Sequence, residues 1–219
     1  MESEQYTLFT STDYDNIKLT EISIASFKPN PLFYLTYPGG ISSEIKDFHH
    51  KGMIEFNKGE EVETIKVVAD HIPDKPTVTF AIYFPGPKPP KRKLKAPVDA
   101  NFKFINEVKK QTGPHSQKFY RENEHIKVHL VCALPQYQRK GLGSKLGNYI
   151  KARAEELQKR VFVQATPEGT SLYLKLGFEL HAEAIVELNG FGGEGTYVQS
   201  TISWNPCKRQ GGDVNMDGI

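Results

Sequence analysis

A change of hydrophobic period between residues 125 and 157 constrains the fold more than any other feature of the chain. HIKVHLVCAL (125–134) alternates as a β-strand does, because successive side chains of a strand point to opposite faces. From Gly141 onward the apolar residues have the spacing of one helix face: Leu142, Leu146, Tyr149, Ile150, Ala154 and Leu157. The turn QRKGLG (138–143) joins the two patterns. A strand that passes through a glycine turn directly into a helix predicts a mixed α and β fold with a helix N-terminus at this turn.

The rest of the chain also alternates between strand and helix patterns. Strands are predicted at 6–10, 63–70, 77–84, 160–165, 184–190 and 196–204. Helices are predicted at 13–27, where Asp13 or Asp15 is the expected cap, and at 42–56, 100–113 and 167–178. The proline-rich segments 28–40 and 85–97 are predicted to be loops. The basic loop 85–97 has two interpretations, an exposed loop or a cover for a substrate or nucleic acid, and the first is favoured because the rest of the chain balances its charge.

The composition describes one globular domain. The chain has 219 residues, of which 38% are hydrophobic and 25% charged, and its formal net charge is +2. We predict a single domain over 1–207 and a polar tail over 208–219. The small net charge argues against a nucleic-acid partner, and no apolar run is long enough to cross a membrane. Cys132 and Cys207 fit no disulfide or zinc spacing, so we predict a cytoplasmic protein without a metal, either a monomer or a homodimer.

Two motif matches fail in their context. GFGGEG (190–195) fits a dinucleotide-binding pattern, but it leads into a predicted strand, whereas that pattern opens a helix. DVNMDG (213–218) resembles the first half of a calcium-binding loop, but no residue occupies the position of its bidentate glutamate. The glycine turn at 138–143 is therefore the strongest candidate for a ligand site.

That turn has the features of a phosphate-binding site. Gly141 and Gly143 allow the backbone to approach a ligand closely, and the first N–H groups of the helix have no partner within the helix. Together with the helix dipole, these N–H groups form a cradle for a pyrophosphate. Arg139 and Lys140 add positive charge. Taken alone, the same residues are equally typical of a tight, solvated basic turn.

A resemblance over more of the chain favours the ligand site. QYQRKGLGSKL resembles the Q/R-x-x-G-x-G/A signature of the Gcn5-related N-acetyltransferase (GNAT) superfamily, with Gln138, Gly141 and Gly143 in the signature positions. SLYLKLGF (171–178) is similar to the second signature of that family, LYxKxGF. VFVQATPEGTSLYLKLGF resembles a fungal-type branch that acts on small molecules. The resemblance is firm over residues 125–178 and extends less closely over 60–205.

The resemblance implies an α+β fold with a mixed, mostly antiparallel sheet that is splayed between the strands at 126–134 and 161–165. Acetyl-coenzyme A (acetyl-CoA), the implied cosubstrate, lies in that gap. Its pantetheine arm is expected along Val131, Ala133 and Leu134. Its pyrophosphate is expected on the turn formed by Gln138, Arg139, Lys140, Gly141, Leu142, Gly143 and Ser144. Many relatives carry an asparagine where this chain has Thr166, so Thr166 or Ser171 is expected to bond the pantetheine arm.

The chemistry of acetyl transfer requires an acid and a base. Tyr173 occupies the position of the tyrosine that lies near the coenzyme sulfur in the family, and it is predicted to protonate the leaving thiolate. A backbone N–H near Ala133 is predicted to stabilise the oxyanion. In place of the glutamate that serves as the base in many relatives the chain has Lys127, which cannot accept a proton in its charged state. The predicted base is His129. Strand alternation places it on the same face as Lys127, Val131 and Ala133, and opposite Leu130 and Cys132.

Other assignments remain open at this stage. The alternative to a catalytic role for His129 is a structural one, and Glu122 or Glu124 is then the base. We predict an N-acetyltransferase acting on a primary amine of a small molecule, with Tyr34 and Tyr37 of the aromatic segment 28–40 lining the acceptor site. The alternatives are a protein or peptide N-acetyltransferase and a non-catalytic module that binds acyl-CoA.

Overall fold

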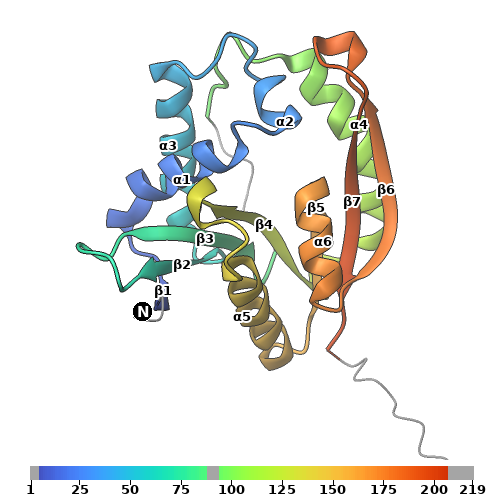
Figure 1. Cartoon of the computed structure of the whole chain (residues 1–219). Coiled ribbons are helices and arrows are strands. Elements are labelled where there is room, and N and C mark those ends of the chain that lie inside the picture. Colours follow the sequence, from blue (N-terminus) through green and yellow to red (C-terminus); the bar gives the residue numbers. More distant parts are fainter. Residues whose placement is uncertain (1–4, 88–93, 207–219) are drawn as a thin grey trace, which may run out of the picture.

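A seven-stranded sheet forms the centre of the protein (Figure 1). The computed structural model describes residues 5–87 and 94–206. The strand order is β1-β2-β3-β4-β5-β7-β6, and β4 and β5 are parallel whereas the other neighbours in this described sheet are antiparallel. The strands are β1 (Tyr6–Thr10), β2 (Glu63–Ala69), β3 (Thr77–Phe84), β4 (His125–Ala133), β5 (Arg160–Ala165), β6 (Glu179–Glu187) and β7 (Thr196–Trp204). The prediction of a mixed, mostly antiparallel sheet is confirmed.

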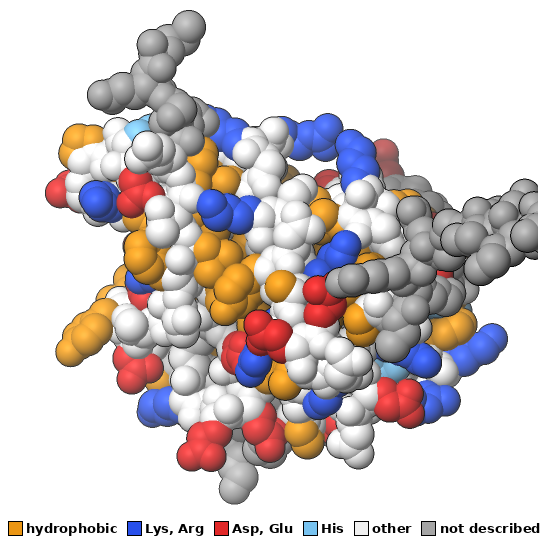
Figure 2. All heavy atoms as spheres, turned by 90° about the horizontal axis from the view of Figure 1, so that it is seen from below, with side chains coloured by type: hydrophobic (Ala, Val, Ile, Leu, Met, Phe, Trp, Pro, Cys, Tyr) orange, Lys and Arg blue, Asp and Glu red, His pale blue; other side chains and the backbone are white. Residues whose placement is uncertain are grey.

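Helices cover both faces of this sheet. They are α1 (Asn16–Phe27), α2 (Pro31–Tyr34), α3 (Ser43–Asn57), α4 (Phe102–Phe119), α5 (Leu142–Glu156) and α6 (Pro167–Lys175). One core cluster joins α5 and Tyr173 of α6 to one face, and another joins α1 and α3 to the other face. Helix α4 packs along β6 and β7 (Figure 1). The lower face in Figure 2 shows acidic and basic side chains interspersed among its described residues, in keeping with the net charge of +2.

Some predicted elements differ in extent. Helix α4 continues through Pro114 to Phe119, beyond the predicted end at residue 113. Helix α2 lies inside the predicted loop 28–40, because Pro31 starts it and the Asn30 side chain accepts a hydrogen bond from the Leu32 N–H. The centre of the predicted loop 85–97, Cys207 and the predicted tail 208–219 lie outside the described residues.

The predicted alternation of β4 is wrong at His129, whereas Leu130 and Cys132 do share one face and Val131 lies on the other, as predicted. Ile82 pairs with Leu130 but the next residue, Tyr83, pairs with Val128, so His129 is the extra residue of a β-bulge. The bulge shifts the alternation by one residue. Val131 packs in the cluster under α5, whereas Leu130 and Cys132 pack on the α1 and α3 face. His129 contacts Phe56 and Phe84 of that second cluster, so it lies on the face opposite Val131 rather than on the same face.

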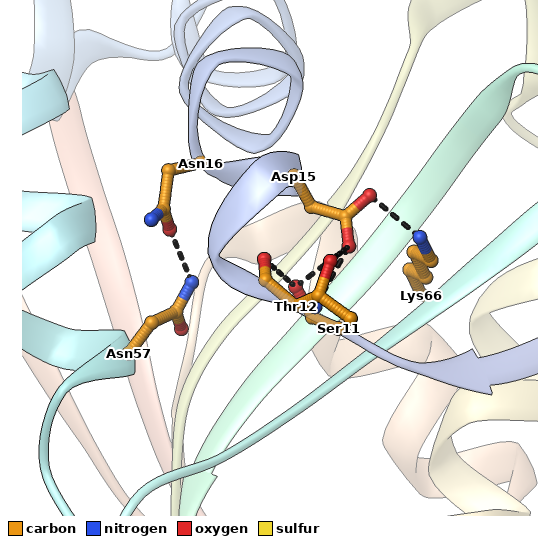
Figure 3. A network of polar contacts seen from close by, with 6 residues as sticks. All are labelled: Ser11, Thr12, Asp15, Asn16, Asn57 and Lys66. Atoms are coloured by element: carbon orange, nitrogen blue, oxygen red, sulfur yellow. Dashed lines mark hydrogen bonds and ion pairs between the residues drawn. The ribbon is translucent and has the colours of Figure 1, made fainter.

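A polar network fastens the start of α1 to β2 and α3 (Figure 3). The sequence predicts that Asp13 or Asp15 caps α1. Asp15 is the N-cap residue, but its side chain makes no capping hydrogen bond. Its carboxylate instead accepts hydrogen bonds from the Thr12 N–H at 2.8 Å and from the Lys66 ammonium at 2.5 Å. Burial alone would raise the pKa of Asp15, but the bonds from Lys66 and Thr12 hold it below its usual value. Asn57 donates to Asn16 beside this ion pair. The network fixes the helix that forms part of both cavities described below.

Lys66→Met is expected to destabilise the protein by roughly 2–3 kcal/mol at pH 7, because it leaves the largely buried Asp15 carboxylate without its cation. The pKa of Asp15 is lower in the folded protein than in the unfolded chain, where it is near 3.9. The ion pair therefore contributes its full stabilisation above pH 3.9, and this stabilisation is lost as the pH falls through the pKa of Asp15 in the folded protein. Urea denaturation at pH 7 and at pH 3 measures both effects. Lys75→Met is the control, because Lys75 is an exposed lysine whose ammonium lies 3.8 Å from the Asp70 carboxylate, and it should cost less than about 1 kcal/mol. Equal losses in the two variants would contradict the role of the buried pair.

Candidate active site at the splayed strands

The sheet opens between β4 and β5. Their parallel pairing runs from His125–Arg160 to Val128–Val163, and β4 then continues to Ala133 paired with β3 but not with β5. The Leu134 N–H donates to the Val78 carbonyl on β3. Because strand peptides alternate in direction, the peptide groups of Val131 and Ala133 point the other way, into the opening. The splay therefore presents an edge of backbone donors and acceptors to any ligand between the strands.

A cavity of about 540 Å³ occupies this opening. Twelve of the residues predicted to bind the cosubstrate or to act in catalysis line it: His129, Val131, Ala133, Gln138, Arg139, Gly141, Leu142, Gly143, Ser144, Thr166, Ser171 and Tyr173. Leu134 and Lys140 are not among its lining residues. The Leu134 amide is used by β3, and the Lys140 ammonium lies over the Tyr137 ring, 5.6 Å from its centroid. The structure thus brings together residues from β4, the glycine turn, α5 and α6.

The turn before α5 has the backbone of an anion site. Gly141 is the N-cap of α5 with φ of +80°, a left-handed conformation that suits glycine, and Arg139 has φ of +62°. Since Gly141 has no side chain to cap the helix, the N–H groups of the first turn are directed at the cavity mouth. The Gln138 side chain donates to the Ala133 carbonyl at 3.3 Å and ties the turn to the end of β4. The positive end of the helix dipole adds to the charge of Arg139 at this mouth.

The absence of a side chain at Gly143 allows two helices to pack closely and also leaves room for a ligand. A Cβ at this position would lie 2.8 Å from Cδ2 of Leu172 on α6. The sequence interpretation of Gly143 as room for a ligand is therefore incomplete, because the missing side chain also allows α5 and α6 to pack closely. A substitution at Gly143 disturbs this helix contact together with the cavity, so Ser144 is the better position for a test of anion binding.

Tyr173 lies in the cavity wall in the last turn of α6. Its side chain is only 5% exposed, and its ring packs edge-on against Phe178 at 5.1 Å between centroids. Burial raises the pKa of Tyr173 above its ordinary value. The hydroxyl therefore stays protonated at physiological pH and can donate a hydrogen bond into the cavity.

Thr166 and Ser171 bring hydroxyl groups to the cavity wall from the start and the middle of α6. Thr166 is the N-cap, and its hydroxyl oxygen accepts a hydrogen bond from the Gly169 N–H at 3.2 Å. The Ser171 hydroxyl donates to the Glu168 carbonyl at 3.2 Å. Thr166 thus has a structural task in α6 in addition to its place in the cavity wall.

Several lining residues escaped the sequence interpretation. They come from the end of α1, from β3 and from the far side of the opening: Ser26, Phe27, Pro29, Asn30, Thr79, Gln164, Glu168, Leu172 and Lys175. Leu172 and Lys175 belong to the second signature, which is a signal that was present in the sequence. The residues of α1 and β3 reach the cavity only through long-range packing, for which no local pattern exists.

A second cavity of about 450 Å³ adjoins the first. The two share Phe27, His129 and Leu130. The second cavity extends from this junction between α1, α2 and α3. Tyr34 and Tyr37, the predicted acceptor residues, are not in its wall. Tyr34 is 42% exposed, and Tyr37 is buried with its ring against Phe33 and His49, which do line the cavity.

His129 stands where the two cavities meet. The bulge directs it from β4 onto the rings of Phe56 and Phe84, at centroid distances of 4.4 and 5.3 Å. The alternative bases lie elsewhere. Glu124 lines a separate cavity near His125, at the start of β4, and Glu122 precedes it in an exposed turn. Of these three titratable residues, His129 is the one in the wall of both adjoining cavities.

Comparisons with known proteins agree with this geometry. Residues 102–192 match the family model described as acetyltransferase (GNAT) domain. This part of the chain is therefore similar to a GNAT acetyltransferase domain. The matched region spans α4 to the β6–β7 turn, and includes the glycine turn, α5 and α6. A search of curated proteins gave no match.

Solved structures extend the GNAT fold over nearly the whole chain. A histone acetyltransferase HPA2 and related acetyltransferase from Corynebacterium glutamicum has a TM-score of 0.61 and 17% identity, covering 92% of this chain and 96% of the other. The polyamine N-acetyltransferase of Drosophila melanogaster has a TM-score of 0.62 and 17% identity, with 92% and 100% covered. The C-terminal condensation domain of Ebony has a TM-score of 0.69 and 9% identity, with 93% and 100% covered. These likenesses show that α1 to β3, outside the family match, belong to the same fold.

Three further observations concern the described residues. Within residues 5–87 and 94–206, no group of three or more His, Cys, Asp or Glu side chains is placed to hold a metal ion. No helix in the same ranges is long and apolar enough to cross a membrane. Cys132 is buried, and burial raises the pKa of its thiol to about 12. A thiol with this pKa is a poor nucleophile at neutral pH.

Proposed function

We propose that the protein is an N-acetyltransferase that transfers the acetyl group of acetyl-CoA to a primary amine of a small molecule. The observation that supports this proposal most strongly is the meeting of two cavities at His129. One cavity opens between splayed strands at a helix N-terminus, and the other leads away between α1, α2 and α3. A donor and an acceptor that enter by separate routes can then form one ternary complex.

In this proposal the donor is held mainly by backbone. The pyrophosphate of acetyl-CoA lies on the N–H groups of Leu142, Gly143 and Ser144 with Arg139 beside them. The pantetheine arm pairs with the peptide groups of Val131 and Ala133 as an added strand does. Thr166 and Ser171 contact this arm from α6. Both side chains and backbone therefore place the thioester next to Tyr173 and His129.

The proposed transfer is a direct attack of the amine on the thioester. His129 takes the proton from the acceptor ammonium, directly or through one water, and the neutral nitrogen attacks the carbonyl carbon. A backbone N–H of the β4 edge near Ala133 stabilises the oxyanion. Collapse of the tetrahedral intermediate breaks the C–S bond while Tyr173 donates a hydrogen bond to the leaving sulfur. The nitrogen loses its second proton to water, which leaves a neutral amide, and the thiolate takes up a proton from solvent. The high pKa of Cys132 favours this route over an acetylated cysteine intermediate.

Ser144→Asp tests the proposed donor site. The new carboxylate at the third helical position should stabilise α5 slightly through the helix dipole, but it faces the pyrophosphate with like charge. We expect the affinity for acetyl-CoA to fall about 10-fold or more, the equivalent of ~1.4 kcal/mol, when measured by isothermal titration calorimetry.

Asn148→Asp is the matched control, because it adds the same charge to an exposed position of α5 one turn further along the helix. Its affinity should stay within about twofold of the parent protein. If Ser144→Asp remains folded and binds acetyl-CoA as tightly as Asn148→Asp does, the pyrophosphate does not lie on this turn.

A further inference from the structure

The wall of the second cavity has an unusual chemistry for a site that receives an amine. Its described lining residues include no Lys, Arg, Asp or Glu. They are Thr20, Ser23, Phe27, Leu32, Phe33, Phe48, His49, Gly52, Met53, Phe56, Leu94, His129 and Leu130. Four phenylalanines from α1, α2 and α3 thus surround a space of about 450 Å³, which is the size of a site for one small organic molecule.

From this wall we infer that the acceptor is a monoamine with an aromatic or branched apolar body and no second charged group. This inference rests on the proposed function, and it narrows the class of acceptor. The amino group lies at the junction with the donor cavity, near His129. The apolar body lies against Phe33 and Phe48 at the far end.

Among the described wall residues, the titratable side chains are His49 and His129, and the hydroxyls of Thr20 and Ser23 have partners within the protein. The Thr20 hydroxyl donates to the Asn16 carbonyl at 2.7 Å, and the Ser23 side chain is hydrogen-bonded to the Cys132 thiol. His49 packs its ring against Phe33, Tyr37 and Phe48. A carboxylate or a second ammonium in this space would lose hydration without meeting an oppositely charged Asp, Glu, Lys or Arg side chain among the described wall residues, which is unfavourable. Amino acids, diamines and polyamines are therefore poor acceptors.

The same wall helps the amine to become a nucleophile. An alkyl ammonium ion in water has a pKa of about 10, so almost all of it is protonated at pH 7. An apolar environment disfavours the charged form and lowers the pKa of the bound amine. His129 at the mouth of the cavity is placed to receive the proton. The apolar body of the acceptor needs apolar contacts, whereas its amino group needs a proton acceptor. The cavity provides these at its opposite ends.

Matched acceptors test this inference without any mutation. 2-Phenylethylamine and phenylalanine share one aromatic body, and phenylalanine adds a carboxylate. 3-Methylbutylamine and 1,4-diaminobutane are a second pair, in which a branched apolar end replaces a second amine. We expect each apolar monoamine to have a kcat/KM at least ~100-fold higher than its charged partner, measured by release of the coenzyme thiol.

Phe48→Glu extends the test to the cavity wall. Phe48 is only partly buried, so the protein is expected to fold with a carboxylate there. The preference should shift towards 1,4-diaminobutane by ~10-fold or more, because its second ammonium gains a partner. Tyr34→Glu is the control, since Tyr34 is an exposed aromatic residue outside the wall, and it should keep the original preference.

Calorimetry separates this inference from the proposed function. The amines are titrated into protein saturated with coenzyme A, so that binding is measured without transfer. Preferential binding of 2-phenylethylamine without any acetylation would overturn the proposed function and keep the inference about the cavity. Acetylation or tighter binding of 1,4-diaminobutane, phenylalanine, an aminosugar or a lysine peptide, with the apolar monoamines inferior, would overturn the inference and keep the transferase. If no amine binds with measurable affinity at millimolar concentration, the inference is wrong.

Discussion

His129→Gln is expected to lower kcat by ~100- to 10,000-fold at pH 7, the range typical of general-base catalysis. Glutamine approximates the size and hydrogen-bonding capacity of histidine, but it cannot accept a proton at neutral pH. His129 lies in the wall of both cavities, and in the proposed mechanism it is the residue that removes the proton from the acceptor ammonium. Steady-state thiol release between pH 6 and 10, with an amine that the parent enzyme accepts, measures the effect.

The pH profile distinguishes a base from a packing residue. A histidine base is active in its neutral form, so the activity of the parent enzyme should rise with pH as the imidazole loses its proton. The variant should lack this limb and recover part of its activity at higher pH, where more of the amine is neutral. Loss of the ring contacts with Phe56 and Phe84 would instead lower activity equally at every pH.

His181→Gln is the matched control for this experiment. His181 is an exposed histidine of β6 that bonds Ser203 and lines neither of the two adjoining cavities. It should leave kcat and the pH profile unchanged. If His129→Gln keeps full activity and the same limb, His129 is structural, and the base must be a water chain or a carboxylate that reaches the site in another way.

Local patterns predicted the parts of the site that lie on single elements. The strand at 125–134, the glycine turn and the tyrosine of α6 each have a signature within a dozen residues, and the structure brings Gly141, Ser144 and Tyr173 to one cavity. The direction of His129 was predicted wrongly. A bulge depends on how β4 pairs with β3, and nothing in HIKVHLVCAL itself indicates the extra residue.

The acceptor side could not be predicted because it is built from contacts distant in sequence. Phe33, Phe48 and Phe56 surround the second cavity together with His129, although about 70 to 100 residues separate them from it in the chain. Helical spacing indicates that such residues are buried, but it does not show whether they surround a core or a cavity. The segment 28–40 did contribute, through Leu32 and Phe33 rather than through the predicted Tyr34 and Tyr37.

The high pKa of Tyr173 changes the role expected of this residue. A thiol titrates near pH 8.5, whereas burial holds the pKa of the Tyr173 hydroxyl above its ordinary value near 10. Complete transfer of the phenolic proton to the leaving thiolate is therefore uphill. A hydrogen bond from the hydroxyl to the sulfur has no such cost, and it strengthens as negative charge develops in the transition state. We therefore expect Tyr173 to act as a donor that keeps its proton, with the proton of the thiol product coming from solvent.

Tyr173→Phe is expected to lower kcat by roughly 100-fold and to leave the affinity for acetyl-CoA within about twofold, because the lost contact forms mainly in the transition state. The phenyl ring preserves the packing against Phe178, so the fold should be retained. The shape of the pH profile between pH 6 and 10 should also be retained, since the hydroxyl does not titrate in this range.

Tyr120→Phe is the control, because Tyr120 is a partly buried tyrosine in the wall of neither cavity. A descending limb near pH 10 that disappears in Tyr173→Phe would show that Tyr173 gives up its proton after all. Full turnover in that variant would remove Tyr173 from the mechanism.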